Sequence, residues 1–181
     1  MKYNIALVPH NRQIFIDYAG QSLGAAHQNS YLIGEQSLPH ITLCHFLAEP
    51  DQIPMIWQAI EAQQLQKTNL FIRLAFIRSK SYSGSVIEDG SWVSLIPNHL
   101  FELNHLHQNI AKIIKHPTNA AWAHYDPHLT LFNTKDLAGY QAIATPTVIN
   151  PPFEEHFSLV LGTSDAVGQL TSILYPSNVT T

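Results

Sequence analysis

The sequence of 181 residues contains little cysteine and few basic residues, and each shortage excludes a class of protein. Cys44 is the single cysteine, so no disulfide can form within the chain and no zinc site with several thiolates can be built. Nine Lys and Arg residues against thirteen Asp and Glu give a formal net charge of -4, which argues against tight non-specific binding to long nucleic acid. A small anionic ligand is compatible with this charge.

Long apolar runs are also missing, so the chain is not expected to cross a membrane. No stretch reaches the roughly 18 apolar residues that a membrane-spanning helix needs. The apolar part of the N-terminal stretch MKYNIALVPH is too short for the core of a signal peptide, and no small-residue cleavage site follows it. The 45% of apolar residues can bury a substantial core. We therefore expect a soluble, cytoplasmic protein with no membrane contact and no obligate protein partner.

Hydrophobic periodicity predicts an alternation of strands and helices along the chain. Strands are expected at 3–9, 39–47, 69–77, 92–97, 127–133, 156–163 and 170–175, and helices at 12–26, 51–65, 98–115 and 135–144. A hairpin turn is expected at 88–91, and a loop at 145–152. No linker rich in Pro, Gly or Ser divides the chain, so we expect one domain over residues 1–181.

The sequence resembles itself at an offset of 88 residues. PHITL (39–43) falls on PHLTL (127–131), and IALVP falls on VSLIP at the same offset without a gap. This period is too long for a solenoid unit, so it predicts two half-repeats, 1–88 and 89–181. The expected fold class is α+β, with two lobes related by an approximate two-fold axis. Each lobe would be an antiparallel-rich sheet covered by helices, with a central cleft between the lobes.

Each copy of the repeat carries a histidine and a threonine two positions apart, directly behind a proline. Side chains alternate between the two faces of a strand, so His40 and Thr42 share one face, and so do His128 and Thr130. A single His-x-Thr in a strand is most often part of a core. Two copies at the offset of a repeat favour a shared site, because the two polar faces would line one cleft if the lobes meet around a two-fold axis.

The two motifs PHITL and PHLTL resemble the paired H-x-T signatures of the two-histidine (2H) phosphoesterase superfamily, which includes the bacterial 2′,5′-RNA ligase-like and cyclic phosphodiesterase proteins. IALVP before the first helix and FLAEP after the first motif are similar to the usual surroundings of these signatures. Asn133 stands where many members carry a basic residue. The resemblance implies hydrolysis of a 2′,3′-cyclic phosphate, or cleavage or ligation of a 2′,5′ linkage, with a nucleotide or short RNA as the partner.

The residues of the two motifs suit that chemistry. Breaking a P–O bond in a cyclic phosphodiester needs a base for the attacking water and an acid for the leaving alkoxide, on opposite sides of phosphorus. Imidazoles perform both tasks near neutral pH, so His40 and His128 are the expected acid–base pair, in an order that the sequence leaves open. Thr42 and Thr130 are expected to donate hydrogen bonds to the non-bridging oxygens. No metal and no cofactor is required. The alternative is a non-catalytic module that binds a nucleotide or phosphate ligand on the same fold.

Further candidates for substrate binding lie outside the two motifs. Arg78 and Lys80 form the densest basic spot, and together with Tyr82 they could hold a phosphate and stack a base. A solvated loop is the simpler interpretation of this stretch. Tyr125, three residues before His128, is a second candidate for stacking on a base.

Strand alternation also assigns the neighbours of the two motifs to faces. His45 is expected off the His40 face, whereas Cys44, Phe46 and Phe132 are expected on the histidine faces. Cys44 is expected to be a small core residue rather than a nucleophile, because no charged neighbour activates it. The two phenylalanines are expected to contribute to the core.

Overall fold

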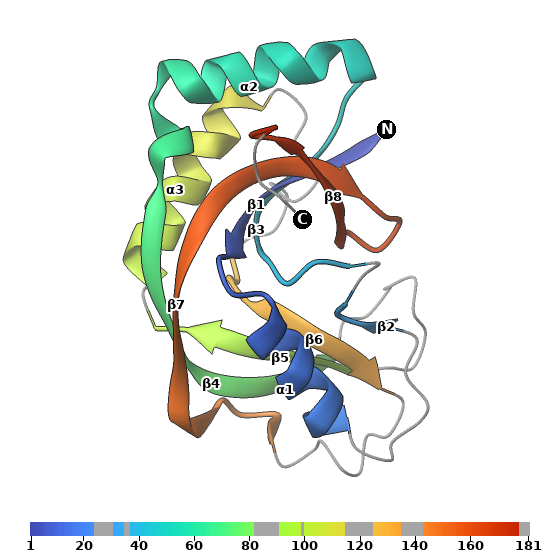
Figure 1. Cartoon of the computed structure of the whole chain (residues 1–181), viewed down its shortest axis with the longest axis vertical. Coiled ribbons are helices and arrows are strands. Elements are labelled where there is room, and N and C mark those ends of the chain that lie inside the picture. Colours follow the sequence, from blue (N-terminus) through green and yellow to red (C-terminus); the bar gives the residue numbers. More distant parts are fainter. Residues whose placement is uncertain are drawn as a thin grey trace.

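The computed structural model describes residues 1–23, 31–34, 37–81, 91–98, 100–114, 125–134 and 143–177. They form a mixed α+β fold with a large antiparallel sheet and few helices (Figure 1). Residues 88–90 of the expected hairpin turn and 135–142 of the expected fourth helix lie outside the described residues. In the described part of the chain, no helix is long and apolar enough to cross a membrane.

The elements follow the predicted alternation at most positions. The strands are β1 (Lys2–Pro9), β2 (Tyr31–Leu32), β3 (Ile41–Leu47), β4 (Asn69–Ser81), β5 (Ser91–Pro97), β6 (Leu129–Thr134), β7 (Thr147–Ser164) and β8 (Leu170–Tyr175). The helices are α1 (Gln13–Leu23), α2 (Ile53–Ala62) and α3 (Leu100–Ile113), with single 3-10 turns η1 (Pro50–Gln52) and η2 (Leu65–Lys67) on either side of α2.

The expected loop at 145–152 is wrong from residue 147 onward, because β7 begins there. The start of β7 pairs with the middle of β4, at Phe76 and Ile77, so tertiary pairing overrides a composition rich in turn formers. The register shifts between the pair Leu74↔Phe153 and the pair Phe76↔Val148. Pro151 and Pro152 fall inside that shift, where a missing N–H removes no bond of the regular ladder.

All of the strands belong to one antiparallel sheet. Its order is β1-β3-β6-β5-β4-β7-β8, with β2 beside β6, and β1 also pairs with β7. The pairings therefore close a ring through β1, β3, β6, β5, β4 and β7, and the long strand β7 arches across the molecule from β4 to β1 (Figure 1). The sequence predicted a separate sheet in each lobe. The pairings instead join the strands into one sheet, and the two-lobed arrangement stays a prediction.

The helices cover the sheet with amphipathic faces. α3 contacts β3, α1 contacts β6, and α2 packs against α3. The buried positions of α3 are Leu103, Leu106 and Ile110, three of the residues that helical periodicity placed on one face. α3 thus packs against the first motif strand, and α1 packs against the second.

The backbone pairing around the two motifs occurs twice at the spacing of the sequence repeat. Leu7 pairs with Ile41 in the first half, and Leu95 pairs with Leu129 in the second. A β-bulge follows each pair: the register shifts between Ile5 and Ala6 on β1, and between Val93 and Ser94 on β5. Each of these positions has its counterpart 88 residues further along the chain.

Candidate functional site

The two motif strands lie side by side in the sheet. β3 and β6 are antiparallel, and Ile41 pairs with Leu129. Both of these apolar side chains are fully buried. One step away along each strand are His40 and His128, which therefore project from the opposite face of the sheet.

The antiparallel register places each histidine beside the threonine of the other motif. In an antiparallel alignment centred on this pair, the neighbouring positions are His40 with Thr130 and Thr42 with His128, and alternation assigns all four side chains to one face. His40 and Thr130 are 5% and 6% exposed, and Thr42 and His128 are partly exposed. The structure thus brings the four predicted catalytic residues together. We call them the HxT set.

A backbone carbonyl fixes the tautomer of each histidine in the HxT set. Nδ1 of His40 lies 2.7 Å from the carbonyl oxygen of Leu38, and Nδ1 of His128 lies 2.7 Å from the carbonyl oxygen of Asp126. A carbonyl oxygen only accepts hydrogen bonds, so each Nδ1 carries the proton and donates it. In the neutral ring, Nε2 then has a lone pair with which it can accept a proton.

Burial favours the neutral form of both imidazoles. It lowers the pKa of His40 to about 4, and the hydrogen bond to Leu38 offsets only part of this effect. A positive charge on His128 lowers the pKa of His40 further, so the two rings are close enough to influence each other. Burial also lowers the pKa of His128, against the hydrogen bond to the Asp126 carbonyl and the charge of the Asp126 carboxylate, which both raise it.

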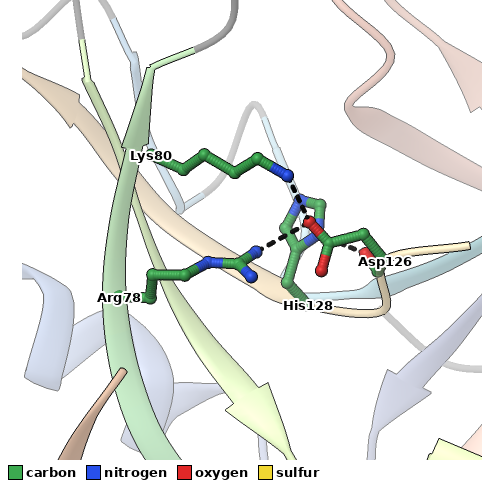
Figure 2. A network of polar contacts seen from close by, with 4 residues as sticks. All are labelled: Arg78, Lys80, Asp126 and His128. Carbon is green, nitrogen blue, oxygen red and sulfur yellow. Dashed lines mark hydrogen bonds and ion pairs between the residues drawn. The ribbon is translucent and has the colours of Figure 1, made fainter. Parts of the chain in front are cut away.

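Arg78, Lys80 and Asp126 form an ion-pair cluster beside His128 (Figure 2). Nη2 of Arg78 lies 2.8 Å and Nζ of Lys80 lies 2.9 Å from the same oxygen, Oδ2 of Asp126. Arg78 pairs across the sheet with Ser94, which in turn pairs with Thr130, so this row lies on the face of the HxT set.

The cluster corrects one expectation about Arg78 and Lys80. The solvated-loop interpretation is wrong for Arg78 and Lys80, because β4 continues to Ser81 and both cations pair with Asp126. Burial alone would raise the pKa of Asp126, but the hydrogen bonds from the two cations hold it below its usual range. Arg78 and Lys80 place two positively charged groups next to His128, where an anionic ligand could contact them.

Tyr125 connects the segment before the second motif to the strand of the first. Its hydroxyl donates to the carbonyl oxygen of Thr42 at 2.8 Å. Its ring stacks on His107 of α3, with centroids 4.2 Å apart and an interplanar angle of 2°. Nδ1 of His107 donates to the carbonyl oxygen of Leu43 at 2.6 Å. The stacking of a base on Tyr125 stays a prediction, and Tyr82 lies outside the described residues.

The β-bulge in β3 overturns three of the face assignments. Asn4 pairs with His45 and Ala6 pairs with Thr42, so one extra residue of β3 separates the two pairs and reverses the alternation. His45 therefore lies on the face of the HxT set, contrary to expectation. Cys44 and Phe46 lie on the opposite face and are fully buried in the core.

The equivalent bulge between β5 and β6 corrects the assignment of Phe132. Val93 pairs with Phe132 and Ser94 pairs with Thr130, so Phe132 lies on the opposite face from Thr130. The core role expected for Cys44, Phe46 and Phe132 is confirmed, since all three are buried. Burial raises the pKa of the Cys44 thiol to about 12, which makes it a poor nucleophile.

Sequence reasoning missed the polar residues that surround Thr42. Nδ2 of Asn4 donates to Oγ1 of Thr42 at 3.1 Å and lies 3.3 Å from the carbonyl oxygen of Gly168. Nε2 of His45 donates to the same carbonyl at 2.6 Å. The sequence feature that could have indicated this group is Asn4, because it is a polar residue inside an apolar strand.

Two comparisons with known proteins found no relative of this chain. No family model matches the chain, and no match to it is found among curated proteins. Within the described residues, no group of three or more His, Cys, Asp or Glu side chains could hold a metal ion.

Proposed function

We propose that the protein is a metal-independent phosphodiesterase that acts on a 2′,3′-cyclic phosphate or a 2′,5′ linkage in a nucleotide or short RNA end. The observation that carries this proposal is the pairing of β3 with β6, which sets two His-x-Thr motifs antiparallel on one face of the sheet. Two imidazoles related in this way suit attack on one phosphorus atom from two sides.

We also propose that the fold consists of two lobes, which arose by duplication and face each other across a cleft. The 88-residue offset supports it, as do the two β-bulges at equivalent positions. The helix contacts also support it, because the helix of each half contacts the motif strand of the other half: α1 contacts β6, and α3 contacts β3.

In the proposed reaction, His40 is the base and His128 is the acid. Nε2 of His40 takes a proton from water, the water oxygen bonds to phosphorus, and a ribose oxygen leaves on the opposite side with a proton from Nε2 of His128, which enters the reaction as the imidazolium. The low pKa of His40 suits the base. The carboxylate of Asp126 favours a protonated His128, although Arg78 and Lys80 oppose it.

The remaining residues stabilise the phosphate. The hydroxyls of Thr42 and Thr130 donate to the non-bridging oxygens, where negative charge develops during the reaction. The cluster of Arg78, Lys80 and Asp126 attracts the anionic substrate to the His128 side of the site.

The direct test is turnover of nucleoside 2′,3′-cyclic phosphates in the presence of EDTA. His40→Ala and His128→Ala should each lower kcat by about 10²- to 10⁴-fold, since that is what general acid–base catalysis contributes. His105→Ala is the matched control, because this histidine is exposed on α3. Tight binding of the cyclic nucleotide without products would favour the non-catalytic module instead. Turnover at the wild-type rate in either histidine variant would contradict the proposal.

A further inference from the structure

Thr42 is surrounded by a buried set of polar groups that does not belong to the HxT set. Its Oγ1 lies 3.1 Å from Nδ2 of Asn4 and 3.5 Å from Nε2 of His45. Both nitrogens also contact the carbonyl oxygen of Gly168, at 3.3 Å and 2.6 Å. That carbonyl belongs to the connection between β7 and β8, which the fold lays against β1 and β3.

The carbonyl of Gly168 fixes the direction of these hydrogen bonds. A carbonyl oxygen only accepts, so the ring nitrogen of His45 that faces it must carry a proton. For the same reason, the amide of Asn4 must turn its NH₂ group toward Gly168, because the flipped amide would set two acceptors against each other. The second proton of that NH₂ group then points at Oγ1 of Thr42.

Thr42 consequently meets two donors and neither of them can accept its proton. Oγ1 accepts from Asn4, and Nε2 of His45 already carries a hydrogen. The hydroxyl of Thr42 must therefore direct its own proton away from Asn4 and His45. Asn4 lies on β1, and the strand order β1-β3-β6 places the second motif strand on the other side of Thr42.

Asn4 is a buried amide that donates two hydrogen bonds and leaves its acceptor unused. It is fully buried, and its Oδ1 has no hydrogen-bond partner among the residues that the structure describes. A buried acceptor without a donor destabilises a protein, so such a group calls for another explanation. The equivalent position in the second half holds Trp92, so only the first motif has an amide in this place.

We propose that Asn4 is a positioning residue, held by Gly168 together with His45, that turns the hydroxyl of Thr42 into an obligate donor to the bound phosphate. This inference rests on the proposed function. It makes the two threonines unequal: Thr42 is oriented before substrate arrives, whereas no amide side chain among the described residues donates a hydrogen bond to Thr130.

A double-mutant cycle tests the proposal. The proteins are the wild type, Asn4→Ala, Thr42→Val and the double variant, with kcat and KM measured on a nucleoside 2′,3′-cyclic phosphate and the fold checked by circular dichroism. We expect Asn4→Ala to lower kcat about 10-fold with little change in KM, because an oriented donor acts on charge that develops in the transition state. In the Thr42→Val background the same change should cost less than about 2-fold. Asn69→Ala is the control, since Asn69 is exposed at the start of β4.

The outcomes separate this inference from the proposed function. Equal losses in both backgrounds would overturn it, because Asn4 would then act without Thr42. A wild-type protein without any turnover would refute the proposed function. In that case, calorimetry measures the binding of inorganic phosphate to the same four proteins. If Asn4→Ala weakens binding much less in the Thr42→Val background than in the wild type, the role of Asn4 is supported. Additive losses of affinity, or no binding, contradict it.

Discussion

Buried neutral histidines should make the protein sensitive to mild acid. The pKa of His40 falls to about 4 in the folded state, from 6.5 in the unfolded chain, chiefly because the ring is buried. The unfolded state then binds more protons than the folded state between these two values. The contribution to stability is therefore fully present above pH 6.5 and is lost as the pH falls toward 4.

The size of the effect follows from the two pKa values. Between pH 7 and pH 5, a group with this shift lowers the free energy of unfolding by about 2 kcal/mol. Burial lowers the pKa of His45 to about 4 as well, so this residue adds a similar loss. Together they remove about 4 kcal/mol, a large part of the roughly 5 to 15 kcal/mol that stabilises a typical domain.

Urea unfolding at pH 7 and pH 5, followed by circular dichroism, measures this loss. The variant His40→Gln keeps a side chain of similar size without an ionisable group, so its loss should be smaller than that of the wild type by about 2 kcal/mol. His105→Gln, on the exposed face of α3, should lose as much as the wild type. If His40→Gln were as sensitive to acid as the wild type, His40 would not be a buried neutral imidazole.

Three further changes test other contacts. Tyr125→Phe removes the donor to the carbonyl of Thr42, so we expect a loss of about 1 kcal/mol in urea unfolding, and an unchanged midpoint would contradict the bond. Asp126→Asn should move the alkaline limb of the pH–rate profile to lower pH, because the carboxylate raises the pKa of His128; an unmoved limb would exclude His128 as the acid. Gly168→Ala should lower the melting temperature, since φ is 96° and a Cβ would come within 2.6 Å of His45; a wild-type melting temperature would refute that packing.

The sequence was enough to predict the motif strands and the helices beside them. The repeat placed His40 and His128 at equivalent points of two strands, and local alternation correctly put Thr42 and Thr130 on their faces. Proline before each histidine and the apolar stripe of α3 gave further local signals. These features depend on residues that are close together in the sequence. A single sequence was therefore enough to predict them.

The failed predictions depend on partners that lie far away in the sequence. A β-bulge reversed the faces of Cys44 and His45, and its position is set by pairing with β1 rather than by the residues of β3. Pairing with β5 extended β4 to Ser81, and pairing of β7 with β4 turned an expected loop into strand. The ion pairs of Asp126 and the contacts of Asn4 with Gly168 likewise join distant segments, so no local pattern announces them.

The central claim is that two imidazoles act as one unit on a single phosphorus, and a comparison of single and double variants measures it directly. Turnover of a nucleoside 2′,3′-cyclic phosphate is compared in the wild type, His40→Ala, His128→Ala and the double variant. Residues that work as a unit are not additive, so the double variant should be scarcely slower than either single one, at about 10²- to 10⁴-fold below the wild type. Losses that multiply in the double variant, or a single variant as fast as the wild type, would show that the two histidines do not share one reaction.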